Sequence, residues 1–147
     1  ESWSCVKDNI TGLIWEVKSD DGGIHDKDNT YRWGGLSAIG RDHVNRKGSY
    51  YDDWNGLVNG SNSSAFCGYS DWRVPGREAL RSIVNYDRSN PAIDTSYFPN
   101  SGSAWFWSSS PIAYVSDLAW VFSFYYGSDN LYDRNYNYHV RLVRGGQ

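Results

Sequence analysis

Residues 3–18 read WSCVKDNITGLIWEVK, and this stretch decides how the first part of the chain is organised. Turn-forming residues from Asp8 to Gly12 separate two short runs, and the second run, 13–17, is almost entirely aliphatic and aromatic. Side chains of this kind favour strands, whereas Asp, Asn and Gly favour tight turns. The stretch therefore predicts a β-hairpin.

The segments that follow predict a polar loop over 19–29 and then two helices. A short helix is expected over 51–58, ended by Asn59 and Gly60. A second helix is expected over 77–85, because three apolar side chains share one helical face after a Pro-Gly start signal. Those side chains are Leu80, Ile83 and Val84.

Strands are predicted in the last third of the chain, over 105–109, 120–125 and 138–144. Alternation is clearest in 120–125, where Trp120, Phe122 and Phe124 are expected on one face and the residues between them on the other. The order of hairpin, two helices and several strands indicates an α+β fold without βαβ repeats. At 147 residues we expect one domain over 1–147.

Composition excludes several classes of function. The formal net charge is −3, and no basic run exceeds the pair Arg46-Lys47, so nucleic acid is not an expected partner. No apolar run approaches the length of a bilayer span, so membrane insertion is not expected either. The sequence contains no Met, which suggests an excised or processed domain whose leader or anchor is not in this chain. No cofactor motif is present.

The two cysteines, Cys5 and Cys67, belong to no metal-binding motif. They are either two buried free thiols or one disulfide that closes a long loop. An aromatic-rich, turn-rich chain with two cysteines is typical of an exported protein, and we therefore favour the disulfide.

Four segments, taken in order, resemble the bacterial Lcl C-terminal-like domain family over nearly the whole chain. They are 6–16 (VKDNITGLIWE), 67–75 (CGYSDWRVP), 106–110 (FWSSS) and 140–146 (VRLVRGG). Domains of this family are found at the end of a collagen-like adhesin and in many exported bacterial and phage proteins. The resemblance implies a C-type-lectin-like fold with paired N- and C-terminal strands, two helices, long irregular loops, and an extracellular or cell-surface location.

Two related classes fit the sequence less well. The closing Val-Arg-Gly-Gly is also similar to the end of formylglycine-generating enzymes, but the nearby cysteine pair of those enzymes is missing, so we do not expect an enzyme. The Glu-Pro-Asn and Gln-Pro-Asp triplets of calcium-dependent lectins are missing too. The acidic stretch with Asp20, Asp21, Asp26 and Asp28 lacks the oxygen spacing of a calcium loop, which favours a solvated loop over a metal site.

The segment 105–144 resembles the variable region of proteins that are diversified by retroelements. Framework positions there would be Trp107, Ser108, Ser109, Ala119, Trp120, Phe124, Gly127, Val140 and Arg141. The positions that would vary between the framework positions, called the scattered positions below, are Tyr114, Val115, Leu118, Tyr125, Tyr126, Leu131, Tyr132, Asp133, Tyr136 and Asn137.

Aromatic residues concentrate in this part of the chain. Residues 97–139 hold 14 of the 25 aromatic residues, interleaved with Asn, Asp, Ser and Gly, so the rings cannot all face inward. We predict a ligand-binding surface; the alternative is that the Tyr rings lie over the sheet edge. The predicted contacts are Phe106, Tyr114, Val115, Leu118, Tyr125, Tyr126, Tyr132, Asp133, Tyr136, Asn137 and His139.

The expected mechanism is aromatic anchoring with adaptable polar hydrogen bonds and no chemistry. The expected partner is a macromolecule, either a protein or a glycan. A glycan-binding tip domain of an oligomeric fibre remains the alternative, and a homo-oligomer remains open. His25, His43 and His139 are dispersed and show no zinc or catalytic signature; the first two are expected on the surface or in loops.

Overall fold

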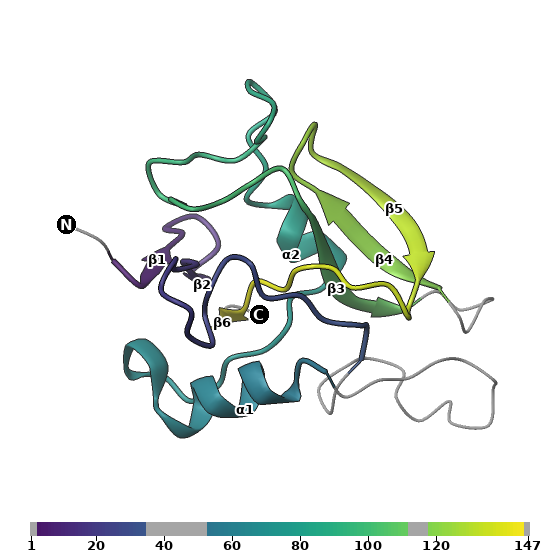
Figure 1. Ribbon diagram of the computed structural model, residues 1–147. Coiled ribbons are helices and arrows are strands. Elements are labelled where there is room, and N and C mark those ends of the chain that lie inside the picture. Colours follow the sequence, from purple (N-terminus) through teal and green to yellow (C-terminus); the bar gives the residue numbers. More distant parts are fainter. Residues whose placement is uncertain (1–2, 35–52, 112–117, 146–147) are drawn as a thin grey trace.

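A computed structural model describes residues 3–34, 53–111 and 118–145 of the chain. These residues form two three-stranded antiparallel sheets, with helices and irregular segments between and beside them (Figure 1). The strand orders are β1-β2-β6 and β3-β4-β5. The predicted α+β class is confirmed.

The first sheet joins the two ends of the chain. It consists of β1 (Cys5–Lys7), β2 (Ile14–Glu16) and β6 (Val143–Arg144), and Trp15 of β2 is opposite Val6 on one side and Val143 on the other. In the turn, the Asp8 carboxylate accepts hydrogen bonds from the Ile10 N–H and the Thr11 hydroxyl, each at 2.9 Å. The predicted hairpin and the pairing of the terminal strands are confirmed.

The predicted strand over 138–144 is wrong in extent, since only its last part belongs to β6. Tyr138 forms a bridge with Tyr31, and His139 forms one with Phe106 of the other sheet. One continuous strand does not form because its two halves pair with different partners.

A disulfide bond joins Cys5 of β1 to Cys67 in the 3-10 turn η1 (Phe66–Gly68). The two cysteines are 62 residues apart in sequence, so the bond ties the N-terminal strand to the segment that follows the first helix. The predicted disulfide is confirmed, and neither thiol is free.

The first helix, α1 (Asn55–Ser63), begins later than predicted and continues through Asn59 and Gly60. Its buried residues Leu57, Val58 and Ser61 face the core. Gly60 does not end the helix; a Cβ there would lie 3.2 Å from Cδ1 of Ile24, so the glycine allows close packing against the loop. Tertiary packing overrides the weak helix propensity of Asn and Gly.

The second helix, α2 (Arg77–Arg81), begins where the Pro-Gly signal predicts but is shorter than the predicted 77–85. Leu80 is fully buried, whereas Ile83 and Val84 lie in the turns after the helix and are half-buried. The helix packs against the second sheet (Figure 1).

The second sheet consists of β3 (Trp105–Pro111), β4 (Leu118–Ser123) and β5 (Ser128–Asp133), with β4 in the centre. The sequence did not predict β5, because Asp and Asn are depleted in strands. The strand forms through continuous pairing with β4, from Ser123 opposite Ser128 to Leu118 opposite Asp133.

Both faces of β4 are covered by core. Trp107 and Val121 belong to one hydrophobic cluster, and Phe106 and Phe122 belong to a second one on the opposite face. The predicted alternation is therefore correct in direction, but it does not separate a buried face from an exposed one. Side chains of this sheet reach solvent mainly from β5, from the β4–β5 turn and from the turn after β5.

Candidate ligand-binding surface

The predicted contact residues do not form one patch. Those that the structure describes lie at three places: the end of β5 and the turn after it, the β4–β5 turn, and a pocket beside β3. Tyr114 and Val115 lie outside the described residues, as does His43.

The first place is a group of four neighbouring rings, Trp105, Tyr132, Tyr136 and Tyr138, which we call the aromatic cluster. Tyr132 lies at its centre, with ring centroids 5.1 Å from Trp105, 5.6 Å from Tyr138 and 6.5 Å from Tyr136. Tyr136 is the most accessible, with 51% of its surface exposed, and Tyr132 and Tyr138 are half-buried. Aromatic rings in such edge-to-face and tilted arrangements stabilise one another.

The turn that carries Tyr136 is held by hydrogen bonds. The Asp133 carboxylate accepts one from the Asn135 N–H at 3.0 Å, and the Asp133 carbonyl accepts one from the Tyr136 N–H at 3.1 Å. Asp133 therefore shapes the turn, whatever else it contacts. Leu118, also predicted as a contact, lies opposite Asp133, and Asn137 is exposed in the same turn.

A second set of contacts fastens this turn to the rest of the protein. Arg134 is buried; its Nε donates to the Leu118 carbonyl at 3.0 Å, and its guanidinium lies 4.1 Å from the Trp33 ring. Tyr31 and Tyr138 exchange two backbone hydrogen bonds. The aromatic cluster is therefore preorganised, which reduces the entropy lost when a ligand binds.

The phenol of Tyr138 remains a neutral donor at physiological pH. Burial raises the pKa of Tyr138, and the neighbouring Tyr132 and Tyr136 raise it further. A neutral phenol offers both an O–H donor and an acceptor lone pair.

The second place is the β4–β5 turn, where Tyr125 and Tyr126 are exposed and their ring centroids lie 4.3 Å apart. Tyr86 is 66% exposed and lies close to Gly127 of the same turn. Tyr126 precedes β5 and Tyr136 follows it, so these two side chains lie at opposite ends of a strand about 17 Å long. The predicted contacts therefore lie on two surfaces that are separated by the length of β5.

The third place is a pocket that two of the predicted contacts line. Phe106 is only 4% exposed, so it does not belong to the exposed surface. Alternation along β3 turns its ring away from Trp105 and into the second core cluster, against Phe122 and Phe124. Phe106 and the half-buried His139 instead line a pocket of about 190 Å³. Burial lowers the pKa of His139, and the nearby Lys18 lowers it further.

A buried group of charged residues beside this pocket was not predicted as a unit. Glu16 is fully buried on β2, and its Oε1 lies 3.0 Å from Nζ of Lys18 and accepts a hydrogen bond from the Leu142 N–H. Its other oxygen contacts Nδ1 of His25, which lies in the 19–29 loop as predicted. Arg141 is also fully buried and donates to the Glu16 carbonyl at 2.7 Å.

The sequence gives one signal for this group. Charged residues occur within the mostly apolar runs 13–18 and 140–143, which are candidates for strands. Charges in such runs are seldom fully buried unless they are paired. Arg141 was assigned to the framework, and its burial agrees with that prediction.

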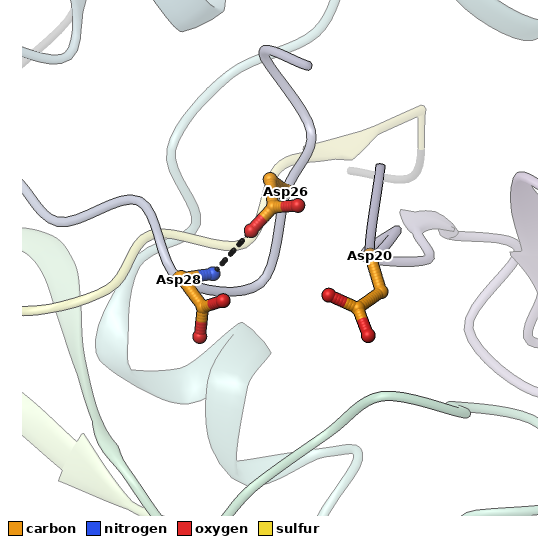
Figure 2. A group of neighbouring side chains, drawn as sticks. All are labelled: Asp20, Asp26 and Asp28. Carbon is orange, nitrogen blue, oxygen red and sulfur yellow. Dashed lines mark hydrogen bonds between the residues drawn. The ribbon is translucent and has the colours of Figure 1, made fainter. Parts of the chain in front are cut away.

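Three acidic side chains of the 19–29 loop lie together, as Figure 2 shows for Asp20, Asp26 and Asp28. Each offers a carboxylate oxygen within 4.8 Å of the others. Asp26 uses both oxygens to accept backbone hydrogen bonds from Gly22 and Asp28, at 2.7 and 2.8 Å, and these bonds lower its pKa. Nζ of Lys27 lies 3.5 Å from Asp28 and 3.9 Å from Asp20. These hydrogen bonds and ion pairs explain why the three carboxylates lie close together: the contacts hold the loop in its conformation.

The structure defines a disulfide-bonded α+β fold that presents a group of neighbouring aromatic side chains on a three-stranded sheet and the turn after β5. The model of the Lcl C-terminal domain family matches residues 4–144, and the chain therefore belongs to that family. No curated protein and no solved structure gives a significant match. Membership is consistent with a ligand-binding module. Among the described residues, no helix has the length and apolar character needed to cross a membrane.

Proposed function

We propose that this chain is a recognition module, displayed outside the cell, that binds a macromolecular ligand through the aromatic cluster. The observation that carries the proposal is the group of four contiguous rings, with the most exposed one on a turn that is fastened from both sides. Rigid Tyr and Trp side chains bring contact area at low entropic cost, and they dominate the energy of many interfaces. The exposed Asn135 and Asn137 add polar donors and acceptors beside the rings.

The same proposal includes a C-type-lectin-like fold. Pairing of the N- and C-terminal strands, a separate three-stranded sheet and long irregular connections support this fold. The disulfide bond supports an oxidising, extracellular location, because such bonds persist there and are rare in the cytosol.

Binding is favoured over formylglycine-type catalysis by the state of the cysteines. The chain contains only Cys5 and Cys67, and they are bonded to each other. No thiol remains to bind a metal or to act as a nucleophile in the way that such an oxidation requires.

We extend the proposal to diversification of the surface. The scattered positions that the structure describes are all exposed or half-buried, whereas the framework positions are buried apart from the half-buried Trp120 and Gly127. This partition supports variation at the surface with a constant core. We expect the neighbouring genomic sequence to contain a reverse transcriptase gene and a near-repeat of the codons for 105–144. Absence of both would remove diversification from the proposal and leave the recognition surface in place.

Replacement of Tyr136 by Ala is expected to weaken ligand binding by about thirtyfold, which corresponds to a hot spot of about 2 kcal/mol. The ligand would first be found by screening the purified domain against arrays of glycans and of surface proteins. Its affinity would then be measured for the wild type and the variant by calorimetry. A glycan ligand would select the fibre-tip alternative, in which the rings stack on sugar faces.

Tyr126→Ala is the matched control, because Tyr126 is even more exposed, at 68%, but lies at the other end of β5. It is expected to leave the affinity unchanged. Equal thermal unfolding of both variants would show that neither change disturbs the fold. Loss of binding in Tyr126→Ala with full binding in Tyr136→Ala would move the site to the β4–β5 turn.

A further inference from the structure

The pocket beside β3 offers a second place for a ligand, with different side chains from the aromatic cluster. Its volume is about 190 Å³, which suits a small group better than a drug-sized molecule. Phe106 and Ala104 supply an apolar wall. The polar lining consists of Lys18, Lys27, Asp28, Asn100 and His139, with Gly102 between them.

Two buried cations, Lys18 and Arg141, lie next to this pocket, and the buried carboxylates of Glu16 and Asp26 lie near Lys18. Lys18 is 3% exposed and Arg141 is 0% exposed, and the one buried carboxylate that both approach is that of Glu16. That carboxylate is already engaged by the Leu142 N–H and by His25. The two cations therefore share the Glu16 carboxylate, which has other partners, and the Asp26 carboxylate that also acts on Lys18 is occupied by the N–H groups of Gly22 and Asp28.

The donors of these two cations are incompletely used. Among the described residues, neither Nζ of Lys18 nor Nε of Arg141 has a hydrogen-bond partner, and the 3.0 Å contact between Lys18 and Glu16 is an ion pair without hydrogen-bond alignment. Burial lowers the pKa of Lys18, and it lowers the pKa of Arg141 to about 10, as expected where counter-charge is insufficient. A buried ammonium whose hydrogen bonds are incompletely satisfied is costly, and Lys18 lines the pocket.

A second ammonium group stands at the pocket wall. Lys27 is about one-third exposed, and its two ion-pair partners, Asp20 and Asp28, are themselves largely exposed. Ion pairs of this kind contribute little, so Lys27 can reorient towards a ligand at small cost.

We propose that this pocket binds a carboxylate group, which the ammonium groups of Lys18 and Lys27 pair with while Ala104 and Phe106 contact the adjoining carbon atoms. A carboxylate accepts several hydrogen bonds at once, and it would supply an aligned acceptor to Lys18. The carboxylate can belong to a small organic acid or to an acidic sugar unit. This site goes beyond the proposed function, because it does not involve Tyr132 or Tyr136.

The test is an NMR titration of the whole labelled chain with sodium glucuronate, sodium acetate and glucose at constant ionic strength. We expect saturable shifts of the pocket amides, those of residues 18, 27, 100–106 and 139, with glucuronate and none with glucose. Equal affinity for acetate identifies a small acid as sufficient, and a marked preference for glucuronate identifies an acidic sugar. The absence of saturable shifts with both carboxylates in the millimolar range would overturn the proposal.

Lys27→Met is the variant that tests the assignment to this pocket. Loss of one charge-assisted contact is expected to weaken glucuronate binding by about tenfold. Lys7→Met, an exposed position on β1, is the matched control and is expected to bind as the wild type does. Unchanged affinity in Lys27→Met would refute the pocket assignment, and it would leave the result for Tyr136→Ala untouched.

Discussion

Replacement of Glu16 by Gln is expected to lower the free energy of unfolding by about 3–5 kcal/mol, although Gln has nearly the same shape. The change removes the charge that the buried Lys18 and Arg141 both depend on. Removing one member of a buried ionic group leaves the other charges without compensation in a medium of low dielectric constant. Urea denaturation followed by circular dichroism would measure the loss.

Glu78→Gln provides the control. The Glu78 side chain is 80% exposed and pairs with Arg81 at 3.6 Å, so its replacement is expected to change stability by less than about 0.5 kcal/mol. A loss below about 1 kcal/mol in Glu16→Gln would show that the buried cations are compensated in some other way.

The same variant has a signature in the pH dependence of stability. Burial alone would raise the pKa of Glu16, but the charge of Lys18 and the contacts with His25 and the Leu142 N–H outweigh it and lower the pKa below the ordinary 4.5. The contribution of Glu16 is therefore fully present above pH 4.5 and is lost as the pH falls through the pKa of the folded state. The variant lacks this part of the acid sensitivity.

Removal of the disulfide by replacing Cys5 and Cys67 together with Ala is expected to cost about 4 kcal/mol, the value that loop-closure entropy assigns to a separation of 62 residues. The bond fastens β1, a strand of only 3 residues, to the segment after α1. Thermal and chemical unfolding of the double variant would measure the effect. Reduction of the wild type should produce a similar loss; a change below about 1 kcal/mol in both cases would contradict the expectation.

Several elements could be predicted because their determinants are local. The hairpin around Asp8 follows from turn chemistry between two apolar runs, and α2 begins after the Pro75-Gly76 signal. The strands β3 and β4 follow from aromatic and aliphatic runs. The order of four short segments was sufficient to recognise the family.

Other elements could not be predicted, because partners distant in sequence stabilise them. β5 contains Asp and Asn and pairs along its whole length with β4. α1 runs through Asn59 and Gly60 because its buried face packs on the core. The predicted site divides because β5 separates Tyr125 and Tyr126 from Tyr136, and linear sequence contains no information about that distance.

By itself, the sequence determined the family, the α+β class, the terminal hairpin and the concentration of aromatic residues in the last third of the chain, since composition, local turns and short motifs are properties of neighbouring residues. Only the tertiary structure decided which rings gather into one surface, that Phe106 points into the core, and that Glu16, Lys18 and Arg141 meet beside a pocket. Those outcomes depend on strand register and on burial, which arise when segments more than 100 residues apart, such as β2 and β6, come into contact.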